Sequence, residues 1–169
     1  RITFAIKAHE RFTRDVADLM PGDPVYLDGP FGAFTLPPRG PLVGIAAGVG
    51  ITPLLSMLET IADRGDHREC VLWLGNRDED SIAGRSRIES LVSRMDLRVV
   101  HVLSRPSERW TGAVGHVDAA FVAAQVGDTP AGATFCICGP DRMMDEVERA
   151  LAQAGIARDA IASERFGMV

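Results

Sequence analysis

Long apolar runs and an excess of positive charge are both missing from this sequence. No stretch approaches the roughly 20 consecutive apolar residues that a membrane-spanning helix requires. The chain does not start with a basic, apolar leader either. Its net charge at pH 7 is -5, which argues against nucleic acid as the main partner. We therefore expect no nucleic-acid binding and no membrane span in this chain.

Cysteine is also scarce. Cys70, Cys136 and Cys138 form an odd set without paired spacing, which fits a reducing, cytoplasmic compartment. No His/Cys group has zinc spacing, and nothing resembles the Cys-x₄-Cys-x₂-Cys run of an iron–sulfur cluster, so we expect no metal. Neither His101 nor His116 has a serine or cysteine partner at an interpretable spacing. Hydrolase chemistry therefore has no support.

What the sequence does contain, from residue 42 onward, is an alternation of strand-like and helix-like segments. We predict strands at 42–47, 70–74, 98–103, 134–138 and 160–166. Apolar stripes of helical period cover 53–62, 88–95, 117–124 and 143–154. The pattern predicts an α/β fold, an open parallel sheet with helices on both faces.

The first forty residues have a different character. Residues 1–7 alternate like a strand, 12–20 fit a short helix, and 24–28 fit a second strand after the turn at 21–23. Because the chain begins in mid-strand, we expect it to be a piece of something longer. The stiff, proline-rich segment 37–41 is the best domain boundary, which gives domains at 1–36 and 37–169.

The glycine turn after the first strand of the α/β part is the main candidate for a binding site. Gly48 and Gly50 lack side chains, Thr52 suits a helix N-cap, and Pro53 suits the first helical position. A helix N-terminus with unpaired N–H groups attracts anions, so a pyrophosphate fits here. A tight strand–helix connection without any ligand is the alternative. Two further turns, at 104–105 and 138–140, follow later strands and meet this one if the sheet is parallel.

These turns resemble a known family. The run Gly48-Val49-Gly50-Ile51-Thr52-Pro53 is similar to the pyrophosphate loop of the ferredoxin–NADP reductase-like superfamily. Four further segments agree in order: Gly-Pro-Phe-Gly at 29–32, Gly-Asn-Arg at 75–77, Ser-Arg-Pro at 104–106 and Cys-Gly-Pro at 138–140. The terminal Glu164-Arg165-Phe166 resembles the family's closing aromatic segment. Pro53, however, stands where the common dinucleotide fingerprint has its third glycine.

The resemblance implies a set of site residues. The cofactor-binding residues it implies are Thr13, Gly48, Val49, Gly50, Ile51, Thr52, Pro53, Arg77, Ser104, Arg105, Cys138, Gly139, Pro140, Met143 and Phe166. Cys138, beside the nicotinamide, and Phe166, over the flavin, are the implied catalytic residues. Ser104 and Arg105 imply NADPH, with NADH as the alternative. The family's Arg-x-Tyr-Ser/Thr flavin motif is absent from this chain, and Glu10 stands at the glycine of a flavin-phosphate turn.

The implied activity is hydride transfer from NADPH to FAD, followed by electron transfer to haem or ferric iron. Residues 1–36 would be the end of a flavin-binding β-barrel, with FAD bound in the full-length protein. Within the superfamily the segments at 3–7, 12–13 and 25–30 look closest to ferric reductases and NADPH oxidase-like flavocytochromes. That type implies an upstream haem-bearing membrane domain and a place at its cytoplasmic face. A soluble reductase serving a ferredoxin or an oxygenase, and a non-catalytic NAD(P)-binding module, are the alternatives.

Overall fold

The computed structural model describes residues 4, 6, 11–29 and 31–165. Its contacts divide the chain into two compact units, Arg1–Ala33 and Phe34–Val169. The division falls after Ala33, and not after Leu36 as the domain prediction has it, because Phe34 and Leu36 pack against the core of the second unit. That the first unit ends a flavin-binding barrel stays a prediction.

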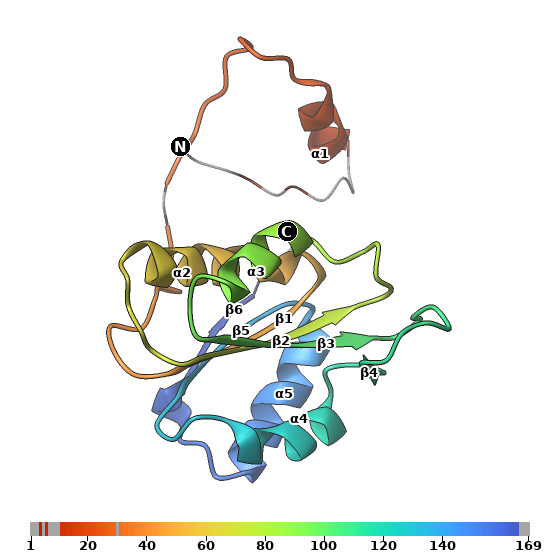
Figure 1. Ribbon diagram of the computed structural model, residues 1–169. Coiled ribbons are helices and arrows are strands. Elements are labelled where there is room, and N and C mark those ends of the chain that lie inside the picture. Colours follow the sequence, from red (N-terminus) through yellow and green to blue (C-terminus); the bar gives the residue numbers. More distant parts are fainter. Residues whose placement is uncertain (1–3, 5, 7–10, 30, 166–169) are drawn as a thin grey trace. The chain divides into compact units, whose positions relative to one another are not determined.

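The second unit is the predicted α/β fold (Figure 1). Strands and helices alternate in the order β1 (Leu42–Ala47), α2 (Ile51–Asp63), β2 (Cys70–Asn76), α3 (Arg85–Val92), β3 (Leu97–Leu103), β4 (Ala113–Val114), α4 (Ala119–Gln125), β5 (Thr134–Cys138), α5 (Asp141–Gln153) and β6 (Ile161–Glu164). In the described residues, six strands form one sheet in the order β4-β3-β2-β1-β5-β6. Every neighbouring pair is parallel. The prediction of an open parallel sheet is confirmed, whereas the two-residue strand β4 was not foreseen.

The central strands are apolar throughout because both faces of the sheet are covered by helices. On the face that α2 and α3 cover, the strands contribute Leu42, Ala46, Leu72 and Leu74. On the opposite face, which α4 and α5 cover, they contribute Val43, Ile45, Val71 and Trp73. Alternate residues of one strand therefore serve two separate cores. This arrangement fixes the register of the strands, and with it the edge at which their carboxyl ends meet.

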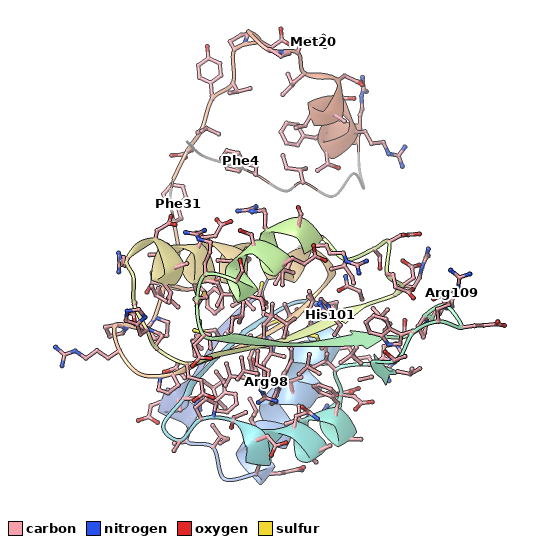
Figure 2. The ribbon with its side chains drawn as sticks, in the orientation of Figure 1. Phe4, Met20, Phe31, Arg98, His101 and Arg109 are labelled. Carbon is pink, nitrogen blue, oxygen red and sulfur yellow. The ribbon has the colours of Figure 1, made fainter. Side chains whose placement is uncertain are left out.

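Two side chains of β3 show the same alternation near the border of the sheet (Figure 2). His101 lies on the α3 side, where its ring is edge-on to that of Trp110, with 6.4 Å between the two ring centroids. Burial lowers the pKa of His101, so the ring is neutral at pH 7. Arg98 lies on the α4 side and donates to the carbonyl of Asp128 at 2.8 Å. Both residues are explained by packing, and neither belongs to the candidate site.

The first unit differs from its prediction. Residues 24–28 form neither helix nor strand, and Val25, Tyr26 and Leu27 are mostly exposed. A strand needs a neighbour to pair its N–H and C=O groups, and the described residues of this unit supply none. The predicted strand at 1–7 lies largely outside the described residues, and Phe4 and Ile6 are not in a strand. The helix predicted at 12–20 is shorter, α1 (Arg11–Asp15) followed by a 3-10 turn (Val16–Asp18).

No helix in the described part of the chain is both long enough and apolar enough to cross a lipid bilayer.

Candidate functional site

The order in which strands are added to the sheet reverses between β1 and β5. From β1 the chain moves outward through β2, β3 and β4, and it then returns to the other side of β1 to form β5 and β6. In open α/β sheets, ligands bind beyond the carboxyl ends of the strands at such a reversal point. Ala46 pairs with Cys138 and Ala47 with Gly75, so the turns after β1, β2 and β5 leave the sheet at one level. Asn76 pairs with Leu103, which brings the turn after β3 to the same edge.

The turn after β1 winds directly into a helix. Gly48–Gly50 form a 3-10 turn, and α2 begins at Ile51 with Gly50 as its N-cap. The prediction that Thr52 is the N-cap is therefore wrong, because the helix starts earlier. The Thr52 hydroxyl instead donates to the carbonyl of Val49 at 3.0 Å. Pro53 is likewise the third residue of α2 and not the first, as predicted, but it still lies in the first turn, where its missing N–H is without cost.

Gly50 is a packing position. A Cβ built on Gly50 would overlap the carbonyl of Cys138 and lie 2.8 Å from the nitrogen of Gly139. Gly139 is equally restricted, since its Cβ would lie 2.7 Å from Cε of Met143 and 3.2 Å from the nitrogen of Ala47. The turns after β1 and β5 are thus in backbone contact. Gly50, which the sequence predicts to give a ligand access to the main chain, is required here by its packing against the turn after β5.

Gly48 is the open position of the same turn. Its φ is +55°, a left-handed conformation that suits glycine, and a Cβ there would meet nothing within 4 Å. Behind it, no side chain caps the N-terminus of α2, and none caps that of α5. At α4, by contrast, the Asp118 carboxylate accepts from the N–H of Phe121 at 2.9 Å. An accessible glycine before an uncapped thirteen-residue helix is the arrangement that binds phosphate groups.

The two predicted arginines lie on adjacent loops at this edge. The N–H of Arg105 donates to the carbonyl of Arg77 at 2.7 Å, and that of Ser104 to the carbonyl of Asn76 at 3.1 Å. The Arg77 side chain forms an exposed ion pair with Asp78 at 2.9 Å. Arg105 is exposed, and in the described part of the chain its side chain has no ion-pair or hydrogen-bond partner. Of these two arginines, Arg105 is therefore the one whose guanidinium is open to an incoming anion.

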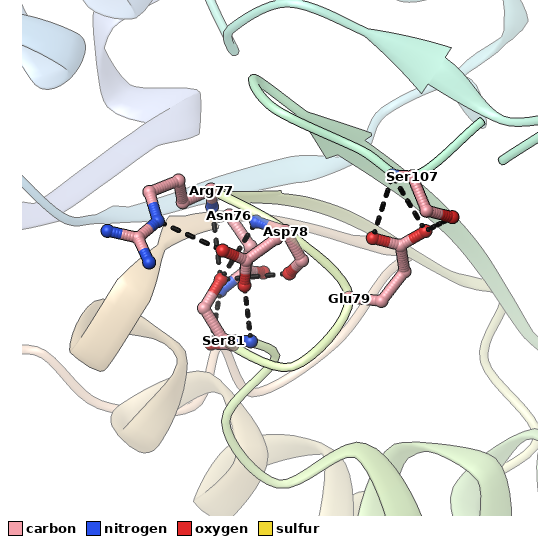
Figure 3. A network of polar contacts seen from close by, with 6 residues as sticks. All are labelled: Asn76, Arg77, Asp78, Glu79, Ser81 and Ser107. Atoms are coloured by element: carbon pink, nitrogen blue, oxygen red, sulfur yellow. Dashed lines mark hydrogen bonds and ion pairs between the residues drawn. The ribbon is translucent and has the colours of Figure 1, made fainter.

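A polar network holds these two loops (Figure 3). Ser81 is its centre in the β2–α3 loop: the hydroxyl accepts from the N–H groups of Arg77 and Asp78, both at 3.1 Å. Glu79 reaches across to the loop after β3, where its carboxylate accepts from the Ser107 hydroxyl at 2.6 Å and from the Ser107 N–H at 3.2 Å. The hydrogen bond from Arg77 lowers the pKa of Asp78, and that from Ser107 lowers the pKa of Glu79. Both acids are ionised at neutral pH.

Cys138 closes β5 at the same edge. Its side chain is fully buried, and burial, reinforced by the nearby Glu164 carboxylate, raises the pKa of the thiol to about 11. Glu164, at the end of β6, is the register partner of Cys138. A protonated, enclosed thiol is not a nucleophile at neutral pH. The geometry fits a positional role for Cys138.

The fold brings together most of the predicted site residues. The turns at 48–53, 77, 104–105 and 138–143 share one sheet edge. Thr13 lies in α1 of the first unit, and Phe166 lies outside the described residues, so both assignments stay predictions. Sequence reasoning missed Glu79, Ser107 and Glu164. Glu79 and Ser107 are 28 residues apart with no pattern linking them, and the place of Glu164 follows only from the pairing of β5 with β6.

Comparison with known proteins agrees with this geometry. Residues 45–149 match the family described as Oxidoreductase NAD-binding domain. The chain is 33% identical to mouse (Mus musculus) cytochrome b5 reductase 4, over 95% of this chain and 32% of the relative. It is 35% identical to ferredoxin–NADP reductase B of Sorangium cellulosum, over 88% of this chain and 64% of the relative. The solved CS-b5R domains of human Ncb5or in the NAD+ form superpose with a TM-score of 0.75 and 29% identity, over 95% of this chain and 47% of that one.

The chain thus spans between about a third and two thirds of the length of these curated relatives. The matched segment begins within β1 and ends within α5, so it contains both glycine turns and both arginine loops. This chain belongs to the oxidoreductase NAD-binding domain family, within the ferredoxin–NADP reductase-like superfamily.

Proposed function

We propose that this chain binds NAD(P)H and presents its nicotinamide to a flavin held by the rest of a larger reductase. The observation that carries the proposal is the reversal point between β1 and β5. There, an open Gly48 precedes the uncapped helix α2, and Gly50 packs directly against the Cys138–Gly139 turn. Phosphate and nicotinamide subsites on two touching turns suit one extended dinucleotide.

The residues of this chain bind the dinucleotide and orient it. The N-terminus of α2 offers N–H groups and partial positive charge to a pyrophosphate, and Gly48 leaves the approach free. The turn after β5 fixes the other end of the nucleotide through its contact with Gly50. When bound, the reduced nicotinamide supplies a hydride that the flavin accepts. Direct transfer between rings needs no acid or base, and the protonated Cys138 offers neither a proton acceptor nor a nucleophile.

We further propose a preference for NADPH through Ser104 and Arg105. Arg105 is exposed and has no ion-pair partner among the described side chains, so it suits the 2′-phosphate. A charged hydrogen bond of this kind is worth ~1.5–3 kcal/mol, or about one to two decades in affinity. Arg105→Ala should weaken NADPH binding by that factor in calorimetric titrations and leave NADH binding unchanged.

Arg109→Ala is the matched control, because Arg109 is exposed on the same loop and is not assigned to the nucleotide. It should leave the affinity for both nucleotides as it is. Equal losses for NADPH and NADH in Arg105→Ala, or no loss at all, would remove Arg105 from the 2′-phosphate subsite.

The flavin partner is proposed to lie upstream, in a barrel domain that the first unit completes. Large apolar side chains of this unit are exposed, among them Phe12 (77%), Tyr26 (97%) and Phe31 (80%). Apolar residues at this density are normally covered by the remainder of a domain. For the whole protein we propose a ferric reductase-like arrangement, with a haem-bearing membrane domain further upstream and this unit at its cytoplasmic face.

A reductase that serves a ferredoxin or an oxygenase is the second candidate, favoured by the similarity to a ferredoxin–NADP reductase. A module that binds NAD(P) without turnover is the third. Rapid-mixing measurement of flavin reduction by NADPH in the full-length, flavin-loaded protein separates them. Fast reduction supports either reductase, and the acceptor that reoxidises the flavin fastest, ferric chelate or ferredoxin, distinguishes the two. Binding of NADPH without flavin reduction would overturn both.

A further inference from the structure

Arg68 holds the segment that leads into the nucleotide-binding unit. It precedes β2, and only 10% of its side chain is exposed. Its guanidinium donates to the carbonyl of Pro37 at 2.8 Å and to the carbonyl of Pro38 at 3.2 Å, which are 31 and 30 residues away in the sequence. Such long-range bonds from a nearly buried arginine fix one segment of backbone against another.

Asp66 orients this arginine. Its Oδ2 accepts from Nε of Arg68 at 2.9 Å and from Nη2 at 2.6 Å, while Oδ1 accepts from the Arg68 N–H at 3.1 Å. Both carboxylate oxygens are thus committed to Arg68. The fork that remains on the guanidinium points at the two proline carbonyls. The arrangement is a clamp, which we define as Asp66 and Arg68 together with the carbonyls of Pro37 and Pro38.

The segment under the clamp is also attached on both sides of it. Phe34 and Leu36 pack on the α2-side core before it. After it, the carbonyl of Pro41 accepts from the N–H of Thr134 at 3.0 Å, at the start of β5. Proline at 37, 38 and 41 restricts φ and removes backbone donors. Residues 34–41 therefore have little freedom of their own.

We propose that residues 34–41 form a rigid strut of the nucleotide-binding unit, locked by Arg68, and that motion between the two units pivots on the amino-terminal side of Phe34. The proline-rich segment that the sequence marks as a linker is then not a hinge. The boundary between the units, after Ala33, agrees with this, because the strut begins at the next residue.

The consequence for catalysis rests on the proposed function. Hydride transfer depends on how constantly one ring is held against the other, so loosening the strut should lower the rate of transfer. Arg68 precedes β2 at the amino ends of the strands, whereas the nucleotide turns are at the carboxyl ends. A seven-residue strand separates the two by roughly 20 Å. Arg68 is therefore a positioning residue that does not touch the nucleotide.

Limited proteolysis tests the strut in the chain itself. Arg39 is exposed in the clamped segment, and trypsin cuts after it only when the surrounding backbone opens. Arg68→Met should speed cleavage after Arg39 about tenfold relative to cleavage after Arg109, an exposed loop site in the same unit. Arg68→Lys, which keeps the charge but loses the fork, should give an intermediate rate. An unchanged ratio, or equal acceleration at Arg39 and Arg109 in both variants, overturns the proposal.

The second measurement uses the full-length, flavin-loaded protein. Arg68→Met should slow flavin reduction at saturating NADPH by about tenfold and leave the dissociation constant of NADPH unchanged, with partial rescue in Arg68→Lys. A change in the dissociation constant in place of the rate would contradict a positioning role. If the native protein reduces no flavin and Arg68→Met still opens the strut, the proposed function fails and the strut stands.

Discussion

At the scale of single residues, the two glycines of the turn after β1 show how one residue type serves two purposes. Gly48 has a positive φ and open space beside it, whereas Gly50 has no room because the end of β5 occupies that space. A methyl group is therefore tolerated sterically at one position and excluded at the other. Within one turn, Gly48 therefore leaves room for a ligand, and Gly50 allows close packing against the end of β5.

Alanine should have different effects at the two glycines. Gly48→Ala should cost about 1 kcal/mol of stability, from strain in the left-handed conformation, and weaken nucleotide binding about tenfold by crowding the phosphate approach. Gly50→Ala should cost about 2–4 kcal/mol, because the Cys138–Gly139 turn must shift. Urea denaturation and nucleotide titration of both variants test this. A Gly50→Ala protein as stable as the native one would show that the contact is not tight in solution.

The buried cysteines predict how stability changes with pH. Burial raises the pKa of Cys70 to about 12 and the pKa values of Cys136 and Cys138 to about 11, from an ordinary value of 9.0. Above pH 9 the unfolded chain loses these protons while the folded chain keeps them, so the folded state loses stability as pH rises. The urea concentration at the midpoint of denaturation should therefore decrease as the pH is raised from about 9 to about 11. In Cys136→Ala, the midpoint should decrease less with pH, relative to its own value at pH 7, than it does in the native protein. An equal decrease in both proteins would contradict a raised pKa for Cys136.

At the scale of elements, the bond between Glu79 and Ser107 joins the loops after β2 and β3. Ser107→Ala removes the 2.6 Å hydroxyl bond but keeps the backbone N–H, so the loop should loosen without unfolding. We expect NADPH affinity to fall about threefold through Arg105, and hydrogen exchange at 104–109 to increase. Ser93→Ala, which removes a bond at the far end of α3, is the control and should change neither.

The same contact has a defined pH dependence. Because the Ser107 hydrogen bond lowers the pKa of Glu79 below its ordinary 4.5, its stabilising effect is present above that value and is lost as pH falls through the lowered one. NADPH affinity in the native chain and in Ser107→Ala should therefore converge below about pH 4.5. A constant ratio at all pH values would show that the bond does not act through an ionised Glu79.

Elements with strong local signals were predictable, and contacts between distant segments were not. The bounds of β1 and β5 match the prediction, because apolar runs there end at glycine turns. β4 has two residues and forms only because Val102 and Leu103 are available to pair with it. The strand expected at 24–28 has strand-forming residues, but the described part of the first unit contains no strand to pair with it. The Asp66–Arg68 clamp joins segments about 30 residues apart. Its acceptors are backbone carbonyls, so no pattern of side chains in the sequence could predict it.

At the scale of the whole molecule, the two units differ in how complete they are. In its described residues, the second unit has two cores, and each of its strands is paired within one sheet. The described residues of the first unit contain one short helix, no strand and no buried residue, so they have no core of their own. Nucleotide binding needs only the second unit, whereas a flavin site of the kind proposed needs a complete barrel. Binding and turnover should therefore separate in this chain.

We predict that this chain, purified by itself, binds NADPH but is colourless and does not reduce a dye. The flavin motif Arg-x-Tyr-Ser/Thr is absent from its 169 residues, and Glu10 adds bulk and negative charge at the glycine of the flavin-phosphate turn. The nucleotide turns, by contrast, lie on a sheet whose central strands are fully covered. Calorimetry should show NADPH binding that Gly48→Ala weakens, while absorbance after gel filtration with added FAD should show no bound flavin. A yellow preparation that reduces dye with NADPH would establish that the first unit suffices to hold the flavin and is a working flavin site.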